Sequence, residues 1–357
     1  MAKRKKQNPT ESSGYHNSSA KKGETQYIGI WITGILLLTL VAFYPSFKCG
    51  FTNWDDGGYV TENKLIVSLS GDNIRKIFST ENHVMLNYHP LTMLSLALDY
   101  NSAKLEPARY HLVNVILHLL NTLLVFFFSF LLSRRKIAVA IIVSLFFGIH
   151  PMHVESVTWI SERKDVLYTF FFMTALIAYL FYNESKKIKF ILLAFILFVL
   201  SLLSKAMAVV LPVVMLLIDY YQGRKITMKT IVEKIPFFIL SFIFGWLAMK
   251  IQSKEAIAGY EVFTLFHRVS FGFYGFFNYI WKLFFPVNLS CFYPYPITDL
   301  QGALPFSFYA PAFCGILLFI FVGIMSFLKK EKMKLIAFGI GFYFVTIALV
   351  LQFLSVG

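Results

Sequence analysis

The sequence predicts an all-α protein, a polytopic bundle of transmembrane helices. Three observations support this: 57% of the 357 residues are hydrophobic, 15% are charged, and the mean hydropathy is +0.64. Soluble domains contain about a quarter charged residues. Apolar runs long enough to cross a hydrocarbon core of about 30 Å recur along the whole chain. The composition therefore excludes an ordinary soluble enzyme.

The apolar runs predict about nine full spans and one ambiguous segment. Residues 1–26 are polar and basic, so we expect a disordered cytoplasmic tail ahead of a transmembrane domain over 27–357. The segment 265–285 is long enough to cross, but its many aromatic residues favour a re-entrant or interfacial position. The full spans are expected at 27–46, 111–132, 137–149, 166–182, 190–203, 206–218, 235–249, 309–328 and 335–354.

The distribution of charge predicts the orientation of the chain. The basic tail and four basic clusters between spans fall on one side, which the positive-inside rule makes cytoplasmic. The long loop at 47–109 is then external, with six Lys/Arg and seven Asp/Glu. Much of the net charge of +14 lies in the tail and inner loops. We therefore expect a lipid bilayer (the cell inner membrane in a bacterium) and no nucleic acid as a partner.

The external loop begins with two adjacent acids, Asp55 and Asp56, followed by Gly57 and Gly58. Because glycine tolerates positive φ, this pattern predicts a tight turn that presents two carboxylates just outside the bilayer. A partly desolvated carboxylate there has a raised pKa and is a reasonable general base. The alternative, favoured by the tetrapeptide alone, is an Asx-type turn with solvated acids.

A second charged segment precedes the span at 166–182. Arg163 and Lys164 lie at its external end beside Glu162 and Asp165. Arginine pairs bidentately with phosphate, so this segment is a candidate site for a lipid phosphate. The alternative is a charged loop that anchors the helix end. Five more candidate residues would line the same outer cavity or its headgroup region: His89, His150, His153, Lys205 and Arg268.

Histidines also suggest other readings. His150 and His153 lie close to Glu155, but Pro151 interrupts the helix and no further ligands complete a tetrahedral site. We therefore predict no metal and no certain cofactor, with a divalent metal as a minor alternative. In the span at 111–132, polar residues share one face and either form interhelical hydrogen bonds or line a polar cavity. They are His111, Asn114, His118 and Asn121.

Six segments occur in series over about 45–357: NWDDGGYVTEN, HPLTMLSLALDY, YHLVNVILHLLNTLL, GIHPMHVESVTWISERKDVLY, LLSKAMAVVLPVVMLLIDYY and CFYPYP. Together they resemble the transmembrane and tetratricopeptide-repeat protein O-mannosyltransferases and their bacterial relatives, which are GT-C glycosyltransferases. The resemblance implies a GT-C-like fold and transfer of a hexose, mannose in that family, from a polyprenyl-phosphate carrier to a protein or glycan acceptor outside. It places the catalytic acid on Asp55 or Asp56 and is compatible with Arg163 and Lys164 near the donor phosphate.

Two departures from the family pattern affect the functional prediction. No repeat of about 34 residues appears, and the chain stops at the end of an apolar run, so we expect a truncated or reduced version without the C-terminal repeat region. A transporter or flippase of a lipid-linked or polar solute is the alternative function, with the His/Asn face as its path. A non-catalytic membrane scaffold is a third reading.

Overall fold

The computed structural model describes residues 27–225, 227–252, 264–293, 304–327, 331–351 and 353. Within this part of the chain the secondary structure is helical, with a single isolated β-bridge between Val84 and Asn87. The prediction of an all-α protein is confirmed for these residues. The predicted N-terminal tail lies outside them.

Each predicted apolar segment folds as a helix close to its expected bounds. These helices are α2 (Ile28–Phe43), α5 (Pro107–Leu132), α6 (Ile137–Ile149), α8 (Arg163–Ser185), α9 (Ile188–Ser204), α10 (Leu211–Gln222), α12 (Ile235–Gln252), α13 (Leu265–Phe284), α14 (Phe306–Phe327) and α15 (Glu331–Ile347). The connections contain the shorter α3 (Gly71–Phe78), α4 (Pro90–Ala103), α7 (Val154–Thr158) and α11 (Met228–Val232). Short helical turns are η1 (Tyr44–Lys48), η2 (Gly57–Thr61), η3 (Lys64–Ile66), η4 (Pro151–His153), η5 (Ile160–Glu162) and η6 (Ala206–Val210).

The predicted number of nine full spans is not supported. Within the described residues, five helical segments are long and apolar enough to cross a membrane: Ile28–Lys48, Pro107–Leu132, Ile160–Ser185, Met228–Gln252 and Phe306–Met325. A sixth crossing results if α6 and the segment Pro151–Thr158, bent by 50°, count together. The number was too high because short apolar runs such as 190–203 and 206–218 were taken as full crossings. A 17-residue helix such as α9 is only about 26 Å long, which is short of the hydrocarbon thickness.

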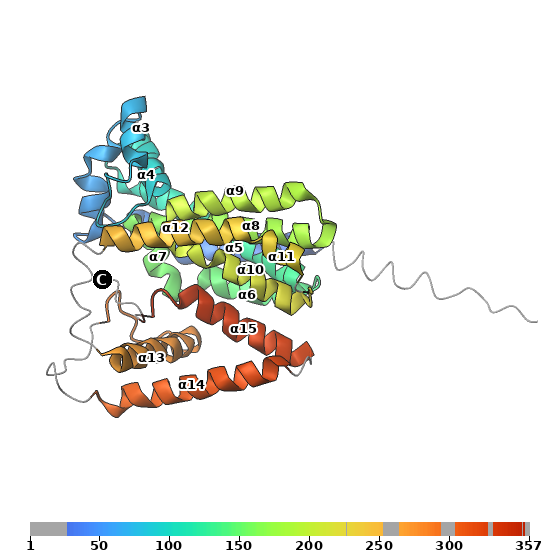
Figure 1. Cartoon of the computed structure of the whole chain (residues 1–357). Helices are drawn as coiled ribbons and strands as arrows, with labels where there is room; N and C mark the ends of the chain where they lie inside the picture. Colours follow the sequence, from blue (N-terminus) through green and yellow to red (C-terminus); the bar gives the residue numbers. More distant parts are fainter. Residues whose placement is uncertain are drawn as a thin grey trace, which may run out of the picture.

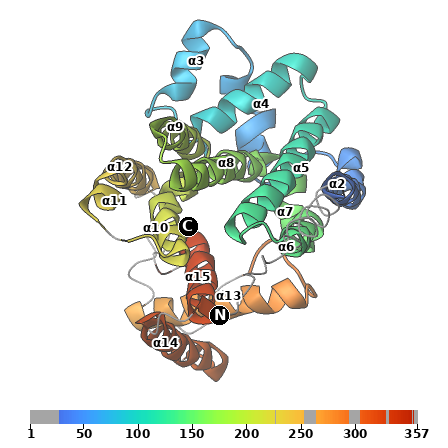
Figure 2. The ribbon, with the colours of Figure 1, turned by 90° about the vertical axis from the view of Figure 1, so that its right-hand side faces the viewer.

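The helices run roughly parallel in one bundle, and the loop that contains α3 and α4 covers one end of it (Figure 1). Viewed along the bundle, α14 and α15 lie away from α2, and α13 extends from them toward α6 (Figure 2). α5 and α8 cross the bundle next to each other, and α8 also packs closely along α9. The central core between α8, α9 and α10 contains the buried Tyr179, Phe198 and Ile218. α5 and α8 therefore provide the rigid frame on which the external loop rests.

Candidate functional site

Asp55 and Asp56 begin a helical turn that continues as the π-helical η2. The predicted tight turn with positive φ at its glycines is wrong, because Gly223 alone among the described glycines has positive φ. Gly58 matters for its size: a Cβ on it would lie 2.7 Å from Sδ of Met85. The glycine thus lets the segment around Met85 approach the turn closely.

Asp56 is completely buried and joins the external loop to the start of α8. Its Oδ2 accepts hydrogen bonds from the backbone nitrogen of Thr52 at 2.8 Å and from Thr52 Oγ1 at 3.1 Å. Its Oδ1 accepts one from the backbone nitrogen of Ser161 at 2.9 Å and another from Ser161 Oγ. Two bonds on each oxygen use the acceptor capacity of the carboxylate. Ser161 is not among the predicted site residues, and nothing in the sequence pairs it with an acid 105 positions away.

Asp55 has different surroundings. Its side chain is 31% exposed, and its Oδ2 lies 3.5 Å from Nζ of Lys164. Lys164 itself is almost buried, with its Nζ 2.8 Å from Oε1 of Glu162 and 4.6 Å from the ring centroid of Tyr59. Asp55 is therefore the accessible acid of the pair, and a buried ammonium group lies beside it.

Glu162 connects this pair to a second lysine. Its Oε2 lies 3.5 Å from Nζ of Lys205, which also forms an ion pair with Asp165. Ser156 donates a hydrogen bond of 3.1 Å to Oδ2 of Asp165. Burial alone would lower the pKa of Lys205, but Asp165 and Glu162 raise it above its ordinary value. We call Asp55, Glu162, Lys164, Asp165 and Lys205 the outer cluster. The structure thus brings five of the predicted site residues together.

Arg163 points away from the outer cluster and is completely buried. It donates to Asp99 Oδ2 at 2.7 Å, to the carbonyl oxygen of Tyr110 at 2.9 Å, to Ser95 Oγ at 2.8 Å and to Asn114 Oδ1. Four of its five N–H groups are therefore engaged with α4 and α5. These contacts hold the external loop, α5 and α8 together.

His89 lies beneath the outer cluster at the start of α4. It is 6% exposed, and burial lowers its pKa to about 3, with further contributions from Lys205 and Lys164. Its imidazole is therefore neutral at physiological pH.

His150 and His153 belong to the bend after α6. His150 Nε2 lies 2.9 Å from the carbonyl oxygen of Leu283, and its Nδ1 accepts from the backbone nitrogen of Met152 at 3.3 Å. His153 packs against Phe147, with ring centroids 4.6 Å apart. Both histidines thus contribute to packing around this bend.

Arg268 lies half-buried on α13, which packs chiefly against α14. It therefore belongs to a different group of helices from the one that carries the outer cluster. In the described part of the chain, no group of three or more His, Cys, Asp or Glu side chains is placed to hold a metal ion.

The polar face of α5 forms hydrogen bonds to backbone carbonyl groups of neighbouring segments. Asn114 Nδ2 donates to Val157 at 3.1 Å, and Asn121 Nδ2 donates to Val166 at 2.8 Å. The Nε2 atoms of His111 and His118 lie 3.1 Å and 3.0 Å from the carbonyl oxygens of Cys49 and Gly148. Of the two readings left open by the sequence, these contacts support interhelical hydrogen bonding. They give no support to a transport path along this face.

The chain is similar to animal protein O-mannosyl-transferases. It is 30% identical to the human protein O-mannosyl-transferase TMTC3 over 154 residues, which make up 42% of this chain and 16% of that protein. It is 35% identical to human TMTC1 over 105 residues, 29% of this chain and 12% of that protein. A Caenorhabditis elegans protein O-mannosyl-transferase is 27% identical over 294 residues, 77% of this chain and 40% of that protein.

These relatives confirm the resemblance to the protein O-mannosyltransferases. The chain spans less than half the length of the curated relatives it matches. No protein-family model matches it. No solved structure matches it either.

Proposed function

We propose that this chain is a membrane glycosyltransferase that transfers a hexose from a polyprenyl-phosphate carrier to an acceptor hydroxyl on the external side. Its relatives are named protein O-mannosyl-transferases, which supports mannose as the sugar and a protein as the acceptor. The observation that carries the proposal is the accessible Asp55 carboxylate next to the buried Lys164 ammonium group, at the start of α8.

Asp55 is the general base in this proposal, because a base needs a free lone pair within reach of the substrate. Its carboxylate is partly exposed and has one ion-pair partner among the described residues, Lys164. Asp56 is fully buried and already accepts four hydrogen bonds, so its role is to hold the turn in place.

Lys164 and Lys205 are the proposed phosphate ligands. Each ammonium group has three N–H donors and contacts two carboxylates, which leaves one donor on each for a phosphate oxygen. Glu162 contacts both lysines and fixes the distance between them. Arg163 is excluded from direct phosphate binding by its burial and acts as a positioning residue.

The transfer is a single displacement. Asp55 accepts the proton of the acceptor hydroxyl while that oxygen forms a bond to the anomeric carbon. The bond from this carbon to the carrier phosphate oxygen breaks, its electron pair stays on the phosphate, and Lys164 and Lys205 stabilise the added charge. Attack from the face opposite the leaving group inverts the anomeric centre.

The proposal is tested by transfer of label from polyprenyl-phosphate-mannose to protein in membranes that contain the chain. Asp55→Asn should lower the rate by about 10²-fold or more, since general bases typically contribute 10²–10⁴-fold. Its thermal unfolding should stay near that of the wild type, because Asp55 is partly exposed. Asp56→Asn should instead lower the unfolding temperature together with the rate.

Asp72→Asn is the matched control, since this acid lies in the same external loop and its side chain is 89% exposed. It should retain full transfer. Full activity of Asp55→Asn would overturn the assignment of the base. Absence of transfer in the wild type with several lipid-linked sugars would overturn the proposed function.

A further inference from the structure

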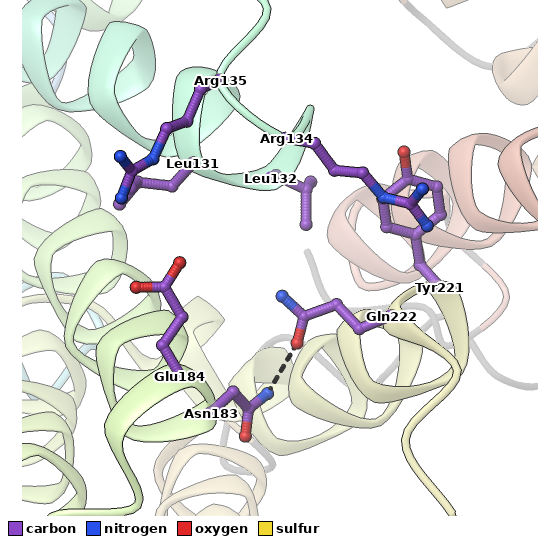
Figure 3. A pocket seen from close by; sticks show the side chains of 8 residues that line it. All are labelled: Leu131, Leu132, Arg134, Arg135, Asn183, Glu184, Tyr221 and Gln222. Carbon is purple, nitrogen blue, oxygen red and sulfur yellow. Dashed lines mark hydrogen bonds between the residues drawn. The ribbon is translucent and has the colours of Figure 1, made fainter. Parts of the chain in front are cut away.

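A pocket of about 440 Å³ opens at the end of the bundle opposite the outer cluster. It lies between the C-terminal ends of α5, α8 and α10 (Figure 3). α8 begins at the outer cluster and is 23 residues long, so its two ends are about 34 Å apart. This length is close to the thickness of a hydrocarbon core. The pocket therefore lies at the level of the opposite headgroups.

The pocket is lined by charges of both signs. Arg134 and Arg135 follow the end of α5, and Glu184 lies near the end of α8. Arg135 and Glu184 face each other across the opening (Figure 3). These two described side chains form no ion pair with one another. A ligand that carries an anion at one end and a cation at the other would complement both.

The backbone conformation after the end of α5 sets the directions of the Arg134 and Arg135 side chains. Arg134 has φ +57° and Arg135 has φ +66°, a conformation that residues other than glycine rarely adopt. The backbone nitrogen of Arg135 donates to the carbonyl oxygen of Phe130 at 2.8 Å, which closes the end of α5. Strained residues of this kind are concentrated at ligand sites.

The polar wall of the pocket is held by a network behind it. Asn183 Nδ2 donates to Gln222 Oε1 at 2.9 Å and to Asp219 Oδ1 at 3.0 Å, and Arg224 Nη1 donates to Asn183 Oδ1 at 3.0 Å. The bond to Gln222 Oε1 turns the amide nitrogen of Gln222 toward the pocket (Figure 3). The site thus offers a fixed N–H donor in addition to the guanidinium group of Arg135.

From these observations we infer that the pocket binds the headgroup of an aminophospholipid. The phosphate lies against Arg135 and the amide nitrogen of Gln222, because guanidinium groups match phosphate oxygens. The primary amine lies against Glu184, and the first part of the acyl chains lies along Leu131 and Leu132. Basic pockets between helix ends are suited to lipid headgroups. This inference does not depend on the proposed transferase activity.

The test measures lipids retained by the purified full chain in native mass spectrometry. The probes are phosphatidylethanolamine, phosphatidylglycerol and phosphatidylcholine with identical acyl chains. We expect phosphatidylethanolamine to be retained most, since it alone carries both a phosphate and a primary amine. Arg135→Gln should lower its occupancy at least about fivefold. Glu184→Gln should lower the occupancy of phosphatidylethanolamine to that of phosphatidylglycerol.

The matched control is Lys187→Gln, which removes the same charge from an exposed position outside the pocket. It should keep the wild-type preference. Equal retention of the three lipids by the wild type would overturn the inference, as would equal losses in the pocket and control variants. Soluble phosphoethanolamine distinguishes a lipid headgroup from a free phosphate ester as the ligand. If it displaces the lipid at millimolar concentration, the ligand is a free phosphate ester. If it does not, the ligand is a lipid.

Discussion

In two pairs of adjacent residues, Asp55–Asp56 and Arg163–Lys164, the two members differ in burial and in their contacts. In each pair one member, Asp56 or Arg163, is fully buried and makes four hydrogen bonds. The other member belongs to the outer cluster. Successive residues of a helical turn point about 100° apart, so one side chain enters the packed interior while its neighbour joins the outer cluster. Adjacent residues of the same charge therefore have different roles here.

The first residue-scale prediction concerns Arg163. Arg163→Ala should lower the free energy of unfolding by about 3 kcal/mol, because it leaves Asp99 buried without its closest cation. Arg109, whose Nε lies 3.3 Å from Asp99 Oδ1, limits the loss. The measurement is thermal unfolding in detergent. Arg75→Ala, at a side chain 87% exposed in the same loop, should change it little. Equal stability of the two variants would contradict the positioning role.

A second prediction concerns pH and His89. The pKa of His89 is about 3 in the folded chain, against about 6.5 when it is exposed. Below about pH 6.5 this imidazole is protonated in the unfolded chain but stays neutral in the folded chain. Protonation therefore stabilises the unfolded state. The free energy of unfolding should fall by about 2 kcal/mol between about pH 6.5 and about pH 5 because of this group. His89→Gln should flatten the pH dependence of the unfolding temperature in this range. An unchanged slope would contradict the burial of this imidazole.

At the scale of helices, close contacts between small residues decide the packing of α6. A Cβ on Gly148 would lie 2.3 Å from Oγ1 of Thr39 and 3.0 Å from Cγ2 of Thr122, and both threonines are fully buried. These atoms cannot retreat without moving α2 or α5. Gly148→Ala should therefore cost about 1–3 kcal/mol of stability.

The same substitution at Gly34 is the control, because a Cβ there meets nothing within 4 Å. Gly34→Ala should leave stability unchanged or raise it slightly, since alanine is the better helix former. Both effects can be read from thermal unfolding of the purified chain. A larger loss at Gly34 than at Gly148 would contradict this packing.

The sequence predicted the helices well and the contacts between them only in part. The apolar run 137–149 coincides with α6, and residues 166–182 lie inside α8. α8 starts earlier, at Arg163, because the charged residues before its apolar run have partners in α4, α5 and the external loop. The family resemblance placed Asp55 and Lys164 in one site, but the burial of Asp56 depends on Ser161, which no local pattern indicates. Tertiary contacts of this kind were beyond prediction.

At the scale of the whole molecule, the bundle has two chemically different ends. The outer cluster lies at the start of α8, and the pocket with Arg134 and Arg135 lies at the other end of this helix. The positive-inside rule assigns the second end to the cytoplasm. Every polar feature of the proposed chemistry then lies outside, and the proposed lipid site lies inside.

This orientation predicts a labelling pattern. Cys49 is exposed and follows η1 at the outer end. A membrane-impermeant maleimide should therefore label it in intact cells when Cys291 and Cys314 are replaced by serine. In the same background with Cys49 also replaced, Glu184→Cys should react only after the membrane is opened. The reverse pattern would invert the assigned orientation.

The enclosure of Arg163 has a consequence for biogenesis. Its partners Ser95, Asp99, Tyr110 and Asn114 are all synthesised about 50 to 70 residues before it. A guanidinium group at the start of a transmembrane helix is costly in lipid until it is paired. The external loop must therefore be translocated and at least partly folded when α8 inserts, so that the arginine meets its partners at once. Insertion of α8 then joins the external loop to the bundle, and Lys205 completes the outer cluster only afterwards.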